Sequence, residues 1–191
     1  MRCLRIVFLL LLNLSACSMA KDSNTQYQKE SLLSSAEALI DTFYSFNSAA
    51  LEVALSEAPS SISSLVYYQG WAEGGNYKIV ERKPCLIQEL TVVRCSITVE
   101  DDPMLALGID FNVTDTFTIS FTNGVVSAVE TSSNDLQIYY DARNWVLTEL
   151  PNLIEDACEG FFDDGATPNE CARLMTEGYR QFVASEDFPD L

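Results

Sequence analysis

The chain has 191 residues, an apolar fraction of 48% that is ordinary for globular proteins, and a formal net charge of −17, which together predict one domain with a sizeable core. Acidic residues outnumber basic ones 28 to 11, so the surface repels phosphate backbones, and nucleic-acid binding is excluded as a function class. The chain contains no histidine, which excludes histidine-dependent catalytic triads, imidazole metal ligation and imidazole proton transfer.

The N-terminus has the pattern of a secretory signal peptide. Two arginines lie in Met1–Arg5, and Ile6–Leu12 is an apolar run that is too short to span a bilayer. The run leads to Leu14-Ser15-Ala16-Cys17, which resembles the lipobox of bacterial lipoproteins, where the signal is cut before a cysteine that is then lipidated. With both arginines removed, 9 basic residues face 28 acidic ones, a net charge of −19.

The lipobox resemblance implies that residues 1–16 are removed and that Cys17 becomes a lipidated N-terminus. Ser18 stands where lipoproteins retained at the inner membrane of Gram-negative bacteria typically have aspartate, so we expect an outer-membrane anchor that faces the periplasm. Membrane contact is expected through this anchor alone. The alternative is cleavage after Ala20, because small residues also precede that position, and it would give a secreted or periplasmic protein.

The mature chain is predicted to have three parts. A polar, flexible tether covers residues 17–30, an α+β domain covers 31–134, and a helical extension that packs on the same domain covers 135–191. The domain opens with three helices, expected from Ser34 to about Phe46, from Ser48 to Leu55, and from Ser60 to Gly74. The first is expected to start at a capping box formed by Ser34 and Glu37.

The spacing of apolar residues then changes to two, which predicts an antiparallel meander. The strands that we expect are Tyr77–Glu89, Thr91–Glu100, Ile109–Thr122 and Val125–Thr131. Asn123-Gly124 is typical of a type I′ turn between the last two. Helices followed by a meander predict an α+β fold in which N-terminal helices pack on a curved, cone-like antiparallel sheet. The apolar segment Met104–Leu107 is expected across the mouth of this sheet.

Helical spacing returns after the sheet. We expect a helix from Asn134 to Phe161 with a kink at Pro151, and a last helix that starts at Thr167-Pro168. The acidic residues between Glu155 and Asp164 lack the alternating ligands of an EF-hand, so a solvated helix face is favoured over a calcium site. No metal site is predicted.

Four cysteines remain once Cys3 leaves with the signal and Cys17 is lipidated: Cys85, Cys95, Cys158 and Cys171. An even number in an oxidising compartment predicts two disulfides. Of the three connectivities we favour Cys85–Cys95 and Cys158–Cys171, because each closes a short loop. A four-cysteine zinc site is the alternative, and it is disfavoured because the chain has no Cys-x-x-Cys pair.

Four basic residues lie in the first two predicted strands: Lys78, Arg82, Lys83 and Arg94. We expect them on the outer face of the sheet, balanced by nearby glutamates such as Glu81 and Glu89, with each exposed pair contributing little stability. A site for an anionic group is the alternative.

The strand Ile109–Thr122 has one exception in its pattern, because Asp115 falls on the apolar face. A buried carboxylate costs several kcal/mol unless it is paired, and desolvation raises its pKa. Such a group suits a general base or a neutral hydrogen-bond donor. The alternative is a β-bulge near Val113-Thr114 that shifts the register and turns Asp115 toward water.

Helices over Ser34–Trp71, followed by a curved sheet that ends in the hairpin Phe117–Val129, resemble the nuclear transport factor 2-like superfamily, which includes SnoaL-like cyclases and ketosteroid isomerase-like proteins. The resemblance covers residues 31–131 and implies a cone whose apolar inner face forms a pocket. Ketosteroid isomerases use aspartates with a tyrosine, so the resemblance makes Asp115 the catalytic candidate. The pocket residues that it implies are Tyr44, Tyr67, Tyr68, Trp71, Phe111, Phe117 and Ile119.

Two functions are compatible with this pattern. The first is an envelope protein that binds a small apolar molecule or an envelope protein through the cone without catalysis, and the lack of histidine favours it. The second is a cofactor-free isomerase, dehydratase or cyclase that uses Asp115 with a tyrosine. No cofactor is predicted, and a homodimer through the sheet is a further expectation.

Overall fold

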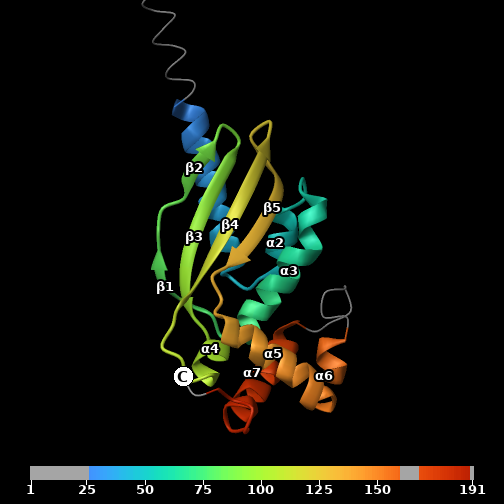
Figure 1. Ribbon diagram of the computed structural model, residues 1–191. Coiled ribbons are helices and arrows are strands. Elements are labelled where there is room, and N and C mark those ends of the chain that lie inside the picture. The colour runs from blue at the N-terminus through green and yellow to red at the C-terminus, as the bar shows by residue number, and fades with distance from the viewer. Residues whose placement is uncertain (1–25, 160–167, 190–191) are drawn as a thin grey trace, which may run out of the picture.

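The protein has an α+β fold in which helices pack on a five-stranded antiparallel sheet (Figure 1), as the sequence predicted. The computed structural model describes residues 26–159 and 168–189. Residues 26–43 are helical, and the elements that follow are α2 (Ser48–Ala54), α3 (Pro59–Gly74), β1 (Lys78–Arg82), β2 (Leu86–Glu89), β3 (Val92–Glu100), α4 (Asp102–Ala106), β4 (Val113–Thr122), β5 (Val125–Ser133), α5 (Gln137–Glu149), α6 (Pro151–Cys158) and α7 (Pro168–Val183).

The sheet has the order β1-β3-β4-β5, and β2 pairs with the edge of β3 that β1 also uses. Figure 1 shows helix 26–43 crossing behind the strands and α4 to α7 grouped beyond the end of the sheet where β3 and β5 finish. Buried and half-buried residues alternate along β3 and β4, so one face of the sheet forms the core. Within residues 26–159 and 168–189, no helix is long and apolar enough to span a membrane.

The first helix extends further toward the N-terminus than its expected capping box predicted. Residues 26–30, which we expected to be part of the tether, are helical, and residues 17–25 lie outside the described part of the chain. Ser34 is an exposed residue inside this helix, where serine costs only about 0.5 kcal/mol relative to alanine. The stripe that buries the helix is Leu32, Ala36, Leu39, Ile40 and Phe43. The stripe includes Leu32, which precedes Ser34, so burial of this face outweighs the predicted start of the helix at Ser34.

The first predicted strand is in fact two strands, β1 and β2. Pro84 lies between them, and because proline has no backbone N–H it interrupts the ladder with β3. The neighbouring Cys85 forms a disulfide with Cys95 of β3, which confirms this predicted pair. The disulfide holds the segment between β1 and β2 against β3.

Arg82 at the end of β1 ties the sheet edge to helix 26–43. Its guanidinium contacts Asp41 at 2.5 Å and Glu37 at 2.6 Å, and Glu37 also accepts the backbone N–H of Cys85 at 2.7 Å. The other ion pairs of these strands are Lys78–Glu100 and Lys83–Glu81. Three of the four basic residues singled out above are therefore paired with carboxylates.

The register between β3 and β4 is regular from Val92↔Ser120 to Val99↔Val113. The bulge that we considered near Val113-Thr114 is therefore absent, and the register shift of β4 lies farther along, where Ser120 and Phe121 pair with β5. The strand begins at Val113 and not at Ile109. Asn123 and Gly124 both have positive φ, at 53° and 83°, as a type I′ turn requires.

The C-terminal helices pack tightly on α3 and on one another. A β-carbon at Gly74 of α3 would lie 2.0 Å from the carbonyl oxygen of Asn169, and one at Gly178 of α7 would lie 2.5 Å from the Val146 side chain. Only glycine permits these close approaches. The disulfide between Cys158 and Cys171 joins α6 to α7 and confirms the second predicted pair. The predicted start of α7 at Thr167 lies outside the described residues.

Candidate functional site

Asp115 lies on the buried face of β4 and has no exposed surface. Two phenols bind it: Tyr44, just past helix 26–43, donates to Oδ2 at 2.9 Å, and Tyr68 of α3 donates to Oδ1 at 2.5 Å. Both oxygens of the carboxylate therefore accept a hydrogen bond. The predicted aspartate is held by two of the three tyrosines that the sequence placed near it.

The pKa of Asp115 is raised from 3.8 to about 6, because burial disfavours its charged form more strongly than the hydrogen bonds of Tyr68 and Tyr44 favour it. Burial raises the pKa of each of these two phenols well above its usual value, and the charge of Asp115 is a further cause of the rise. Near neutral pH the group is therefore a carboxylate held by two neutral phenols.

Of the other predicted pocket residues, Phe117 lies beside the two tyrosines that bind Asp115, with ring centroids 6.3 Å from Tyr44 and 6.5 Å from Tyr68. Phe117 and Ile119 have no exposed surface, and Phe117 packs edge-on against Phe43 with ring centroids 5.0 Å apart. They belong to the packed core and do not form the wall of an open cone. Tyr67 is half-buried on α3, where burial raises its pKa to about 12, and Phe111 is a half-buried residue before β4.

A small pocket lies beside this network, between α3, the end of β5 and the start of α5. Its volume is about 180 Å³. The residues that line it are Tyr68, Trp71, Tyr77, Thr131, Ser132, Ser133, Asp135 and Tyr139, and we call it the inner pocket. Tyr68 connects it to Asp115, and Ser133 is the cross-strand partner of Asp115.

Sequence reasoning placed Tyr68 and Trp71 at this site but missed most of its wall. Tyr77 precedes β1, and Asp135 and Tyr139 lie at the start of the C-terminal helices, so residues far apart in sequence meet here. No pattern in the sequence links these three positions, so it could not indicate that they meet.

The field inside the inner pocket is negative. Burial raises the pKa of Tyr77 well above its usual value, and the charges of Asp101, Asp115 and Asp135 raise it further. Asp101 caps α4 by accepting the N–H of Met104 at 2.8 Å, and its other oxygen receives no hydrogen bond from the described residues. Burial raises the pKa of Asp101 to about 7. Three carboxyl groups thus act on one tyrosine of the pocket.

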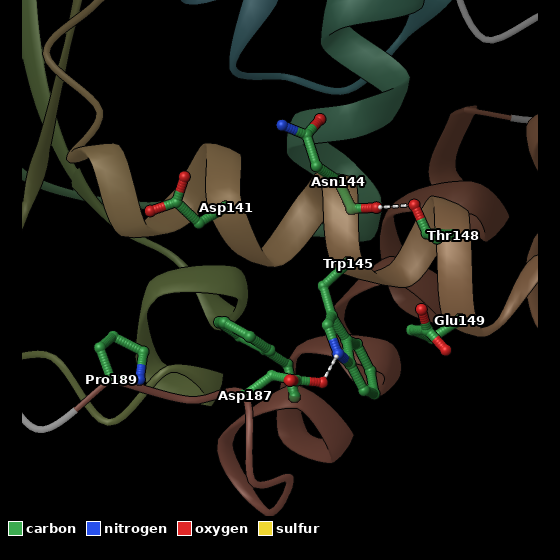
Figure 2. Close-up of a pocket in the computed structure, with 8 residues that line it drawn as sticks. Asp141, Asn144, Trp145, Thr148, Glu149, Asp187 and Pro189 are labelled. Atoms are coloured by element: carbon green, nitrogen blue, oxygen red, sulfur yellow. Dashed lines mark hydrogen bonds between the residues drawn. The ribbon is translucent and has the colours of Figure 1, made fainter.

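A second hollow, which we call the outer groove, lies between α5 and the C-terminal segment. It has a volume of about 560 Å³ and is lined by Asp141, Asn144, Trp145, Thr148, Glu149, Phe182, Asp187 and Pro189. Figure 2 shows Trp145 reaching from α5 to Asp187, and the indole N–H donates to that carboxylate at 2.8 Å. The polar groups of the groove lie at the protein surface.

Comparison with known proteins returns no match: no family model, no curated protein and no solved structure matches this chain. Among the described residues, no group of three histidine, cysteine or acidic side chains is arranged to hold a metal ion. The candidate site consists of a buried aspartate bound by two tyrosines beside a small aromatic pocket. Cys17, the predicted lipidation site, lies outside the described residues.

Proposed function

We propose that this chain is an exported, lipid-anchored envelope protein that binds a small molecule in the inner pocket without catalysis. The observation that carries the proposal is the pocket wall, which combines four aromatic side chains with hydroxyls and one carboxylate. Ligand sites in proteins typically combine an aromatic wall with a few polar groups in this way. The volume corresponds to roughly six water molecules, so the ligand is small.

The geometry changes the expected ligand from an apolar molecule to one with polar character. The apolar inner face of the sheet is filled by helix 26–43 and α3, so it offers no room for a lipid-like guest. The open space lies instead at the polar end of the sheet, beside Ser132, Ser133 and Asp135. A purely apolar ligand would desolvate the carboxylate of Asp135 without supplying a counter-ion, which is costly.

Native mass spectrometry of the purified full chain tests the proposal. Thr131→Trp places an indole on the pocket side of β5, because Thr131 lines the inner pocket and pairs with the buried Phe117, and Thr148→Trp places one in the outer groove as a matched control. We expect a retained small molecule in the wild type and in Thr148→Trp, and its loss in Thr131→Trp. Absence of any retained mass, or retention in both variants, would contradict the proposal.

The proposed location rests on the signal-like N-terminus and is supported by the two disulfides, which persist in oxidising compartments. Metabolic labelling with palmitate tests the anchor. We expect label in the wild type and none in Cys17→Ser. Labelling that is unchanged in Cys17→Ser would refute the lipid anchor while leaving the pocket proposal intact.

A second function, a cofactor-free isomerase, dehydratase or cyclase, is favoured by one observation: the pKa of Asp115 is about 6, close to that of a general base at neutral pH. Two facts weigh against it, since both carboxylate oxygens accept phenol hydrogen bonds and Asp115 has no exposed surface. Exchange of the α-protons of small ketones in D₂O, followed by NMR, tests it. Exchange that is lost in Asp115→Asn would establish catalysis.

The order of helices and sheet also supports kinship with the nuclear transport factor 2-like superfamily, which we retain as a proposal. The packed interior of the sheet differs from the open cone that the resemblance implied. Function therefore rests on the inner pocket and not on the kinship.

A further inference from the structure

The wall of the inner pocket combines aromatic rings with polar and acidic groups and contains no basic side chain. Four of its eight lining residues are aromatic, one is an aspartate, three are serine or threonine, and none is a lysine or arginine. Aromatic rings attract cations through their quadrupole, most strongly where water is excluded. Arg143 lies outside the lining set, with its guanidinium 5.2 Å from the centroid of the Tyr140 ring. The pocket itself therefore carries aromatic and anionic groups with no cation of its own.

Asp135 is positioned to act as a counter-ion. Its Oδ2 accepts hydrogen bonds from the hydroxyls of Ser133 and Tyr140, the latter at 3.2 Å. Its Oδ1 accepts none from the described residues, and Asp135 lines the pocket. One oxygen thus fixes the side chain while the other is available to a ligand.

The buried carboxyl groups behind the wall strengthen this negative field. Asp115 and Asp101 are almost fully buried, and both raise the pKa of Tyr77 through their charge. Charges in such a setting are weakly screened, so they act across the pocket wall. A neutral guest would leave this field uncompensated, whereas a guest with one positive charge offsets it.

We propose that the inner pocket binds a small organic cation of the substituted ammonium class, with Asp135 as its counter-ion and the rings of Tyr68, Trp71, Tyr77 and Tyr139 as its cage. This inference rests on the proposed function and adds the chemical class of the ligand. An organic cation fits better than a metal ion, because the described residues offer no cluster of three metal-ligating side chains. The aromatic wall instead matches the alkyl groups around an ammonium nitrogen.

Isothermal titration of the purified full chain with two matched probes tests the inference. Choline carries a trimethylammonium group, and 3,3-dimethylbutan-1-ol has the same shape with carbon in place of the charged nitrogen. We expect choline to bind at least about tenfold more tightly, since cation–π contacts and the counter-ion act on choline alone. This comparison requires no variant, so it does not depend on how any substitution folds.

Asp135→Asn and Asp141→Asn provide a matched pair of variants. Each replaces one lining carboxylate by an amide of similar shape, the first in the inner pocket and the second in the outer groove. We expect Asp135→Asn to weaken choline binding about tenfold and to change the binding of 3,3-dimethylbutan-1-ol less than about twofold. Asp141→Asn is expected to change neither.

The outcomes separate the two proposals. Binding of the neutral alcohol as tightly as choline, with both abolished by Thr131→Trp, would overturn the cation inference and leave the small-molecule site in place. Choline binding that is lost in Asp141→Asn but kept in Asp135→Asn would overturn the assignment of the site. Failure of both probes to bind, together with absence of a retained mass, would overturn the inference and the proposed function together.

Discussion

The inner pocket and the outer groove both combine aromatic rings with carboxylates, but they hold those carboxylates in different settings. In the outer groove the carboxylate of Asp187 is exposed and accepts the indole N–H of Trp145. Beside the inner pocket, Asp115 has no exposed surface and is bound by Tyr44 and Tyr68. Similar residue types therefore produce two different electrostatic environments.

The difference shows that burial, more than composition, determines how strongly an acidic residue acts on a nearby binding site. A surface carboxylate is hydrated and screened by salt, so it adds little to the potential at a nearby site. A buried one is screened less: the charges of Asp101 and Asp115 add to the rise in the pKa of Tyr77 that burial causes, and burial also raises the pKa of both carboxyl groups. The predictions below compare the two regions, from the largest expected effect to the smallest.

The largest contrast is expected in stability. Asp115→Ala leaves the hydroxyls of Tyr44 and Tyr68 without their acceptor beside a new cavity, and we expect it to lower the free energy of unfolding by about 3 kcal/mol. Asp187→Ala removes an exposed acceptor in the outer groove and should cost less than about 1 kcal/mol. Urea denaturation at pH 7 measures both. Equal losses would show that the two carboxylates are held alike.

The second contrast concerns pH. The folded-state pKa of Asp101 is about 7, above the ordinary value of 3.8, so the folded protein binds this proton more tightly than the unfolded chain does. The resulting stabilisation is complete below about pH 4 and is lost as the pH rises through 7. Asp101→Asn keeps a residue that can cap α4 and removes the charge, so we expect it to be more stable than wild type by about 2 kcal/mol at pH 8.

Thermal unfolding between pH 4 and pH 8 provides this measurement. The stability of Asp101→Asn should depend on pH less steeply than that of the wild type. Asp141→Asn in the outer groove is the matched control and should follow the wild-type curve. A steeper curve for Asp101→Asn, or one parallel to the wild type, would contradict the assigned burial of this charge.

A smaller effect is expected from Tyr68→Phe, which removes one phenol from Asp115. Because that hydrogen bond lowers the pKa of Asp115, its loss should raise the pKa above about 6 and cost about 1 kcal/mol of stability. Titration of the Asp115 carboxyl carbon by NMR measures the shift. Trp145→Phe, which removes the donor to Asp187, should leave this titration unchanged; an equal shift in both variants would argue against a direct bond.

Much of the fold could be predicted from the sequence because its signals are local. Strict alternation placed Asp115 on the buried face, and the short spacings of four cysteines that we predicted to be exported indicated both disulfides. The break at Pro84 and the extra turns before Ser34 were missed. Pro84, which lacks a backbone N–H, divides the first predicted strand, whereas the buried apolar stripe that begins at Leu32 continues the first helix through Ser34.

The inner pocket could not be predicted because its wall is assembled by long-range packing. Tyr77 and Tyr139 have no shared pattern in the sequence, and they line one pocket because β5 ends where α3 and α5 meet. Phe117 and Ile119 were expected to line a cavity because their local alternation places them on the apolar face. Their alternation shows which face they occupy, but not that helices fill the space in front of it.

The two tryptophans of the chain offer the most direct test of the central claim, since Trp71 lines the inner pocket and Trp145 lines the outer groove. Labelling with 5-fluorotryptophan should give one ¹⁹F resonance for each region, assigned with Trp145→Phe. We predict that choline shifts the Trp71 resonance in a saturable way and leaves that of Trp145 unchanged. A shift confined to Trp145, or none at either position, would contradict a cation site in the inner pocket.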